Sequence, residues 1–283
     1  MRWRRAGGVA AAALGVLTAA GGAAAATTRW GWDPDPAVAH TDTAYTSAGV
    51  RVAVERFVPA DGRCAPRART TAGRGCPAVL VLHPSSGLRS PGGAGVRRWA
   101  DALARGSRVA YVVHYFDRTG DRATDDARED AAFPAWTAAL EDAVSFVRRD
   151  PAVDAARVGA FGYSLGGYLA LALGAADPRI SRIVVLSGGL FATLTPRRLP
   201  PTLLLHGAAD RVVPVAEAER AARVLEGLGV PHRLVVYPGQ AHGLAPDLLR
   251  DAVDRATTFL DADGAANGTG GTAAPRAGRP SRS

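Results

Sequence analysis

The chain has 283 residues, of which 47% are hydrophobic and 21% charged, proportions typical of a soluble globular protein rather than a fibrous one. Its formal net charge is +8 and all 34 basic residues are arginine, yet this charge does not indicate nucleic-acid binding. Seven arginines lie in 1–30 and 265–283, where no acid offsets them, so the rest of the chain is nearly neutral. Because no basic stripe with interleaved aromatic residues occurs, we expect no nucleic-acid partner.

The first 26 residues predict a secretory signal peptide. Arginines at the start precede an Ala/Gly/Val/Leu stretch that ends in Ala24-Ala25-Ala26, an A-x-A-like cleavage pattern. We therefore expect a secreted or extracytoplasmic protein, with a cytoplasmic location as the alternative if this is only an alanine-rich leader. Alanine and glycine insert weakly into lipid, so no stable membrane insertion of the mature chain is expected. Residues 27–43 are interpreted as a linker, and 263–283, rich in small residues and Arg, as a disordered tail.

The only two cysteines, Cys64 and Cys76, lie in an Arg/Pro/Gly/Thr-rich segment. In an exported protein such a pair suggests a disulfide that closes a short surface loop, and the alternative is two unpaired surface thiols. Two cysteines without nearby histidines do not make a zinc site, and we expect no bound metal.

Between residues 44 and 262 the hydrophobic pattern alternates between strands and helices. Continuous apolar runs predict strands buried on both faces, and amphipathic stretches predict helices between them. In chain order the predicted elements are a β-hairpin at 44–45 and 50–58, strand 77–82, helix 96–105, strand 108–114, helix 131–149, strand 158–161, a helix to 174, strands 180–186 and 202–205, helix 215–228, strand 232–237 and helix 246–260. This order predicts one α/β domain over 44–262, with a mostly parallel sheet and helices on both faces.

A glycine-flanked serine lies between the strand 158–161 and its helix. The segment Gly162-Tyr163-Ser164-Leu165-Gly166 follows an apolar run and precedes an Ala/Leu-rich stretch, which is the context of a G-x-S-x-G nucleophile elbow. Such a turn strains the serine backbone, and side chains at either glycine would collide with neighbouring backbone. It holds Ser164 Oγ at the carboxyl edge of the sheet and leaves the Leu165 N–H free to bind an anion. The alternative is an ordinary strand-to-helix turn with an idle serine.

A nucleophilic serine needs a base, and the base needs an orienting acid. His242 lies in a loop after strand 232–237, at the edge where Ser164 is expected, and Asp210 lies in the loop after strand 202–205. The order Ser164, Asp210, His242 is the chain order of this architecture. His206 also follows a strand, but its Leu-His-Gly setting is interpreted as structural. Separately, Asp210 could be a helix N-cap and His242 a loop histidine.

The chain resembles α/β-hydrolases of the dienelactone hydrolase family over about residues 44–262. The matching segments are Val79–Leu88, Gly162–Gly167, Leu205–Pro214 and Tyr237–Gly243. The resemblance implies a triad of Ser164, Asp210 and His242 acting on ester substrates, with the backbone N–H groups of Leu165 and Ser85 as the oxyanion hole. The enzymes that name the family have a cysteine at the position of Ser164 and a glutamate at that of Pro84. These departures favour a serine esterase mechanism over the hydrolysis of dienelactone itself.

We therefore expect a serine hydrolase that cleaves carboxylic esters or lactones of small soluble substrates through an acyl-enzyme, with no cofactor. Residues 188–201 are too few for a large cap domain, so the cleft is expected to be open. We also expect Ser86, Tyr163 and Arg118 to contact the substrate. Arg118 or Arg122 would steer an anionic acyl group, unless the charged segment 117–130 is only a solvated loop and helix start.

Three other functions stay open. A prolyl-oligopeptidase-like peptidase shares these motifs, although no propeller-length region precedes them here. An acyltransferase would use an alcohol in place of water on the same acyl-enzyme. A catalytically idle binding module would not need all three triad groups. The sequence makes no prediction of the oligomeric state.

Overall fold

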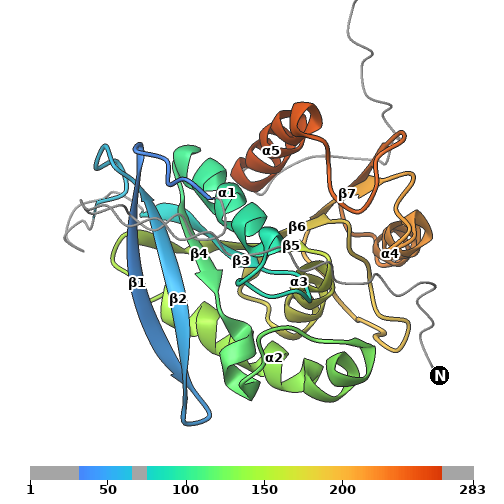
Figure 1. Cartoon of the computed structure of the whole chain (residues 1–283), viewed down its shortest axis with the longest axis horizontal. Coiled ribbons are helices and arrows are strands. Elements are labelled where there is room, and N and C mark those ends of the chain that lie inside the picture. Colours follow the sequence, from blue (N-terminus) through green and yellow to red (C-terminus); the bar gives the residue numbers. More distant parts are fainter. Residues whose placement is uncertain (1–31, 66–74, 263–283) are drawn as a thin grey trace, which may run out of the picture.

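The computed structural model describes residues 32–65 and 75–262, and the predicted signal peptide and tail lie outside the described residues. Within this part, eight strands form one sheet in the order β1-β2-β4-β3-β5-β6-β7-β8 (Figure 1). The strands are β1 (Val38–Ser47), β2 (Val50–Pro59), β3 (Cys76–Leu82), β4 (Val109–Val113), β5 (Val153–Tyr163), β6 (Ile180–Leu186), β7 (Thr202–Gly207) and β8 (His232–Tyr237). Both pairings of β2 are antiparallel, and the pairings from β4 through β8 are parallel. The predicted mostly parallel sheet is confirmed.

Helices cover both faces of this sheet (Figure 1). They are α1 (Pro91–Arg105), η1 (Tyr115–Thr119, a 3₁₀ helix), α2 (Asp126–Val147), α3 (Leu165–Ala176), α4 (Val215–Gly227) and α5 (Pro246–Asp261). Side chains of α1 and α5 pack into one hydrophobic core, and those of α2, α3 and α4 into the other. Among the described helices, none combines the length and the apolar character needed to cross a membrane.

The strand β3 explains why the central strands are continuous apolar runs. Its residues Leu80 and Leu82 belong to the core under α2 and α3, whereas Val79 and Val81 belong to the core under α1 and α5. Because successive side chains of a strand point to opposite faces, a strand covered on both faces needs apolar residues at every position. Because the helices cover the two faces of the sheet, they leave uncovered the edge at which the parallel strands have their carboxyl ends.

Several elements are longer than the sequence pattern predicts, among them β1, β5, α1 and α2. β1 pairs with β2 along its whole length, but at the sheet edge both of its faces are largely polar, so no apolar alternation marks it. α1 begins at Pro91 rather than at residue 96, because Ser90 accepts a hydrogen bond from the Gly93 N–H and caps a glycine-rich first turn. α2 begins at Asp126 rather than at residue 131, capped by Asp125. Much of the segment 117–130 is thus helical rather than loop.

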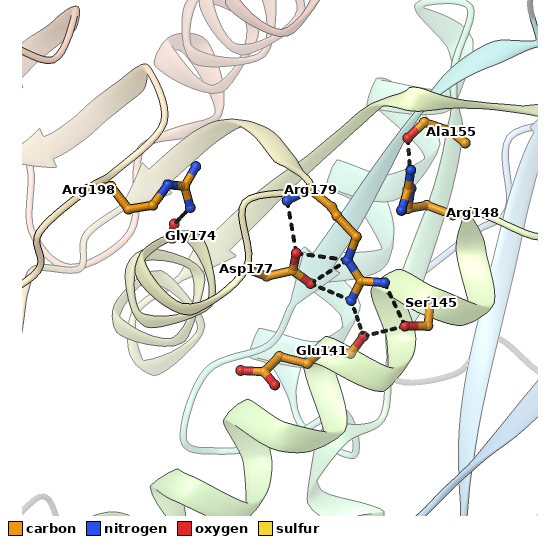
Figure 2. A network of polar contacts seen from close by, with 8 residues as sticks. All are labelled: Glu141, Ser145, Arg148, Ala155, Gly174, Asp177, Arg179 and Arg198. Atoms are coloured by element: carbon orange, nitrogen blue, oxygen red, sulfur yellow. Dashed lines mark hydrogen bonds and ion pairs between the residues drawn. The ribbon is translucent and has the colours of Figure 1, made fainter.

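A polar network fixes the C-terminal end of α3, the helix that follows Ser164. Asp177 pairs with Arg179 at 2.6 Å, and the same guanidinium donates to Ser145 Oγ of α2 at 2.8 Å (Figure 2). From the other side, Arg198 donates to the carbonyl of Gly174 at 2.7 Å. Since the last carbonyls of a helix have no partner within the helix, the Arg198 bond satisfies one of them, and the Asp177–Arg179 pair ties this end of α3 to α2.

Cys64 and Cys76 form a disulfide that ties the segment after β2 to the start of β3. Cys64 is buried, and the two cysteines are 12 residues apart in sequence. The bond constrains the unfolded chain more than the folded one, so it stabilises the domain by restricting a short loop.

Replacing both cysteines by alanine is expected to lower the free energy of unfolding by about 2–3 kcal/mol, as the loop-entropy argument gives for a loop of this length. Urea denaturation of the double variant, compared with the oxidised and the reduced wild-type protein, measures the difference. The reduced wild type should resemble the variant. Identical urea midpoints for all three proteins would contradict a stabilising role of the bond.

Candidate active site

The sharp turn between β5 and α3 places Ser164 at the carboxyl edge of the sheet. Its backbone has φ 56° and ψ −121°, a conformation that L-residues rarely adopt. The flanking glycines allow this turn, because a Cβ at Gly162 would lie 2.0 Å from the carbonyl oxygen of Gly166. A Cβ at Gly166 would lie 2.3 Å from the carbonyl oxygen of Leu82. The segment therefore has the strained, glycine-dependent geometry that the sequence predicts.

Ser164, His242 and Asp210 form one chain of hydrogen bonds. His242 Nε2 lies 2.9 Å from Ser164 Oγ, and His242 Nδ1 lies 2.8 Å from Asp210 Oδ2. Because an ionised carboxylate can only accept, Nδ1 carries the ring proton, which leaves Nε2 as an acceptor for the serine hydroxyl. Ser164 and Asp210 are buried, while 19% of the His242 side chain is exposed. This arrangement can remove the serine proton and hold the resulting imidazolium.

Asp210 is stabilised in its ionised form. Its Oδ1 accepts the N–H groups of Val212 and Val213, both at 2.9 Å. Burial alone would raise the pKa of Asp210, but hydrogen bonds from His206, His242 and the backbone outweigh it and hold the pKa well below its usual value. Asp210 therefore stays a carboxylate at any pH at which the protein is expected to work.

His206 lies beside this carboxylate, and its Nε2 is 3.3 Å from Asp210 Oδ2. From the sequence His206 is interpreted as structural, because its setting is Leu-His-Gly and it precedes any suitable acid. The spacing of four residues between His206 and Asp210 is the signal that could have linked them.

Tyr163, predicted to contact the substrate, packs its ring against His242 with centroids 5.3 Å apart. Burial, with a smaller effect from the charge of Asp210, raises the pKa of Tyr163 to about 12. Its hydroxyl is therefore protonated at neutral pH and can donate a hydrogen bond. The Tyr163 ring thus lies directly beside the ring of His242.

The loop after β3 lies against the elbow. A Cβ at Gly166 would be within 2.8 Å of the His83 carbonyl oxygen, so this loop and the start of α3 are in close contact. Leu165 is the first residue of α3, and its N–H has no partner within the helix. Ser85 follows in the same loop and is half-buried, with its carbonyl held by the Thr124 N–H at 2.9 Å. The two predicted oxyanion donors thus belong to neighbouring segments.

Among the described residues, two predicted substrate contacts form no hydrogen bond with the triad. Ser86 is exposed and hydrogen-bonds Ser90 Oγ at 3.0 Å. Arg118 lies in η1, and its Nε is buried without a hydrogen-bond partner among the described residues. Arg122 instead lines a large pocket of about 960 Å³ beside β2 and η1. A smaller pocket of about 60 Å³ is lined by Leu165, the residue after the nucleophile.

In the described part of the chain, no three His, Cys, Asp or Glu side chains come together as they would around a metal ion.

His83, at the end of β3, is fully buried and stacks on Tyr115 with ring centroids 3.9 Å apart. Burial lowers the pKa of His83 from 6.5 to about 3, although a hydrogen bond to the Pro84 carbonyl opposes the shift. An unfolded chain binds this proton near pH 6.5 and the folded chain does not. The stability that neutral His83 contributes is therefore complete above pH 6.5 and is lost as the pH falls toward 3.

We expect the free energy of unfolding to fall by about 2 kcal/mol through His83 between pH 7 and pH 5. Over this range Glu55, whose pKa is lowered from 4.5 to about 2, contributes little, because its loss of stability begins below pH 4.5. Urea denaturation at both pH values, for the wild type and for His83→Phe, separates the contribution. An equal pH slope in the two proteins would contradict the assignment to His83.

The chain is similar in sequence to known proteins. Residues 67–260 match the sequence profile of the "Dienelactone hydrolase family". A protein of Methylorubrum extorquens named "Putative carboxymethylenebutenolidase" is 26% identical over 233 residues, covering 75% of this chain and 78% of the relative.

Several solved structures have a fold similar to that of this chain. A "Putative Dienelactone Hydrolase" from Klebsiella pneumoniae has a TM-score of 0.65 at 20% identity, covering 79% of this chain and 98% of the other. The esterase Est22 has a TM-score of 0.62 at 17% identity, covering 81% and 82%. At this level of identity the likeness shows the fold alone, and it confirms the predicted α/β-hydrolase fold.

Proposed function

The chain belongs to the dienelactone hydrolase family, and we propose that it is a serine hydrolase of carboxylic esters or lactones that works through an acyl-enzyme. The observation that carries the proposal is the hydrogen-bonded series from Ser164 Oγ through His242 to Asp210, at 2.9 and 2.8 Å. The separation suits proton transfer from the hydroxyl to the imidazole. A metal or organic cofactor has no part in this mechanism.

In the first half of the reaction, His242 Nε2 takes the hydroxyl proton as Ser164 Oγ attacks the carbonyl carbon of the ester. The developing oxyanion accepts the N–H groups of Leu165 and Ser85. Each such donor lowers the barrier by about 2.7–4 kcal/mol. Asp210 stabilises the imidazolium that forms, and His242 then gives its proton to the departing alcohol.

In the second half, water enters the place that the alcohol has left. His242 takes a proton from this water, which attacks the acyl carbonyl, and the Ser164 oxygen regains its proton as the acid departs. The same two backbone N–H groups hold the second oxyanion. Because the histidine returns to its neutral form, the enzyme is ready for another cycle.

The substrate is proposed to be small and soluble. The segment 187–201 between β6 and β7 contains only turns and bends, so no helical cap is inserted in this connection. The pocket beside Leu165, at about 60 Å³, suits a short acyl group rather than a long chain. The relative from Methylorubrum extorquens is named "Putative carboxymethylenebutenolidase", and because a butenolide is a lactone, we propose lactones as substrates beside open esters.

Pre-steady-state hydrolysis of p-nitrophenyl acetate tests this proposal. A burst of about one p-nitrophenol per active site, followed by a slower steady rate, is expected of an acyl-enzyme. A series of esters from two to eight acyl carbons should show falling kcat/KM with length. If the folded protein hydrolyses no ester or lactone in the series, the result would contradict the proposal.

We also propose that the protein works outside the cytoplasm, after removal of residues 1–26. The Cys64–Cys76 disulfide supports this proposal, because such bonds persist in oxidising compartments. Fractionation of cells that express the full chain, with N-terminal sequencing of the exported form, tests it. A cytoplasmic protein with two free thiols would contradict it.

A further inference from the structure

His206 ends β7 and is completely buried beside the triad. Its Nε2 faces two acceptors, the carbonyl oxygen of Val213 at 2.8 Å and Asp210 Oδ2 at 3.3 Å. Its Nδ1 is buried without a hydrogen-bond partner in the described part of the chain. Few buried polar atoms are left unpartnered in this way, and each such atom reduces stability.

These contacts determine the protonation state of the ring. Both partners of Nε2 are acceptors, so Nε2 carries a proton. A second proton at Nδ1 would create a buried N–H with no acceptor, whereas a bare lone pair there costs less. The ring is therefore neutral, with its only N–H aimed between Val213 and Asp210.

The contacts form a closed ring around the carboxylate. Asp210 Oδ1 accepts the Val213 N–H, the Val213 carbonyl accepts from His206, and His206 in turn faces Asp210 Oδ2. Without His206, only His242 would hold Oδ2, and the carboxylate could rotate away from it. A bond to Val213 alone would support the turn but would not require the ring to face Oδ2.

We propose that His206 is a positioning residue of this hydrolase, whose neutral imidazole holds Asp210 Oδ2 in line with His242 Nδ1. The inference rests on the proposed function, because it assigns a role within the same triad. His206 touches neither the substrate nor the reacting atoms. It acts by fixing the group that orients the base.

The test compares His206→Phe, which keeps a ring but removes the N–H, with His206→Gln, whose amide nitrogen reaches the place of Nε2. For His206→Phe we expect kcat to fall about tenfold with KM within about twofold. We expect His206→Gln to keep kcat within about threefold of the wild type. His232→Phe is the matched control, because His232 lies at the opposite edge of the sheet, where its Nδ1 is 2.9 Å from the Val230 carbonyl oxygen.

The pH profile separates positioning from a purely structural role. The titratable side chains that face Asp210 are His206, His242 and Tyr163. A carboxylate that loses a donor becomes more basic and attracts a proton on His242 more strongly. The acid limb of kcat/KM should therefore move upward by several tenths of a pH unit in His206→Phe, and not in His232→Phe.

An unchanged kcat and acid limb in folded His206→Phe, or equal losses in the Phe and Gln variants, would overturn the proposal. If His206→Phe does not fold, His206→Asn replaces it, since its shorter side chain cannot reach Asp210. High activity in Gln with low activity in Asn supports positioning, and equal activities overturn it. Ester hydrolysis that survives Ser164→Ala would instead overturn the proposed function, so the two failures are distinguishable.

Discussion

Ser164→Ala is expected to lower kcat/KM for ester hydrolysis by about four to six orders of magnitude. The variant removes the only atom that can form the acyl-enzyme, while His242 and Asp210 keep their contact. Alanine tolerates the backbone at φ 56° no better than serine, so the strain of the turn is unchanged. The melting temperature should therefore stay within a few degrees of that of the wild type. Steady-state hydrolysis of p-nitrophenyl acetate measures the loss.

Ser187→Ala is the matched control for that measurement. Ser187 follows β6, the strand next to β5, and like Ser164 it is buried and has a positive φ, here 50°. Its hydroxyl has no hydrogen-bond partner among the described residues. We expect its activity to equal that of the wild type. A Ser164→Ala protein that keeps more than about one hundredth of the activity would contradict the nucleophile assignment.

Asp210→Asn is expected to lower kcat by about 10⁴-fold. Because the buried carboxylate is stabilised in its ionised form, the variant is also expected to be less stable than the wild type. The side-chain amide can donate to His242 Nδ1, which would move the ring proton to Nε2 and leave no acceptor for the serine hydroxyl. The positive charge that forms on His242 would also lose its counter-charge. Single-turnover acylation, measured in parallel with the melting temperature, separates this chemical effect from unfolding.

Asp254→Asn, an exposed carboxylate of α5, serves as its control and should be fully active. Because the pKa of Asp210 lies well below its usual value, protonation of Asp210 should not limit the activity of the wild type in mild acid. An Asp210→Asn variant within about tenfold of the wild type would show that the carboxylate does not orient the base.

The sequence predicts most strands of the central sheet and the chain order of the three residues that meet at the site. The strands 180–186 and 232–237 have the predicted bounds, because each ends in an apolar run, 183–186 and 234–237, that a glycine-containing turn follows. Ser164, Asp210 and His242 meet because each follows a parallel strand at the same edge. Such an edge brings together residues that are far apart in the chain.

Other features depend on contacts that no local pattern records. β1 lies at the sheet edge, and because both of its faces are largely polar, no apolar alternation in the sequence predicts it. Glu55 lies in β2 with an unremarkable alternation, yet Arg97 from α1 pairs with it at 2.5 Å in the interior. The role of His206 depends on the turn Asp210–Val213, which folds the carboxylate back toward the strand that precedes it. The distance between such groups in the sequence says little about their distance in space.

The account is tested most directly by labelling the protein with an activated fluorophosphonate and locating the adduct by mass spectrometry. The reagent phosphonylates a serine only where a base removes its proton and donors hold the developing charge. We predict one adduct per chain, on the peptide that contains Ser164, and none in Ser164→Ala or after acid unfolding. Equal labelling of the wild type and Ser164→Ala, or no labelling of a folded wild type, would contradict it.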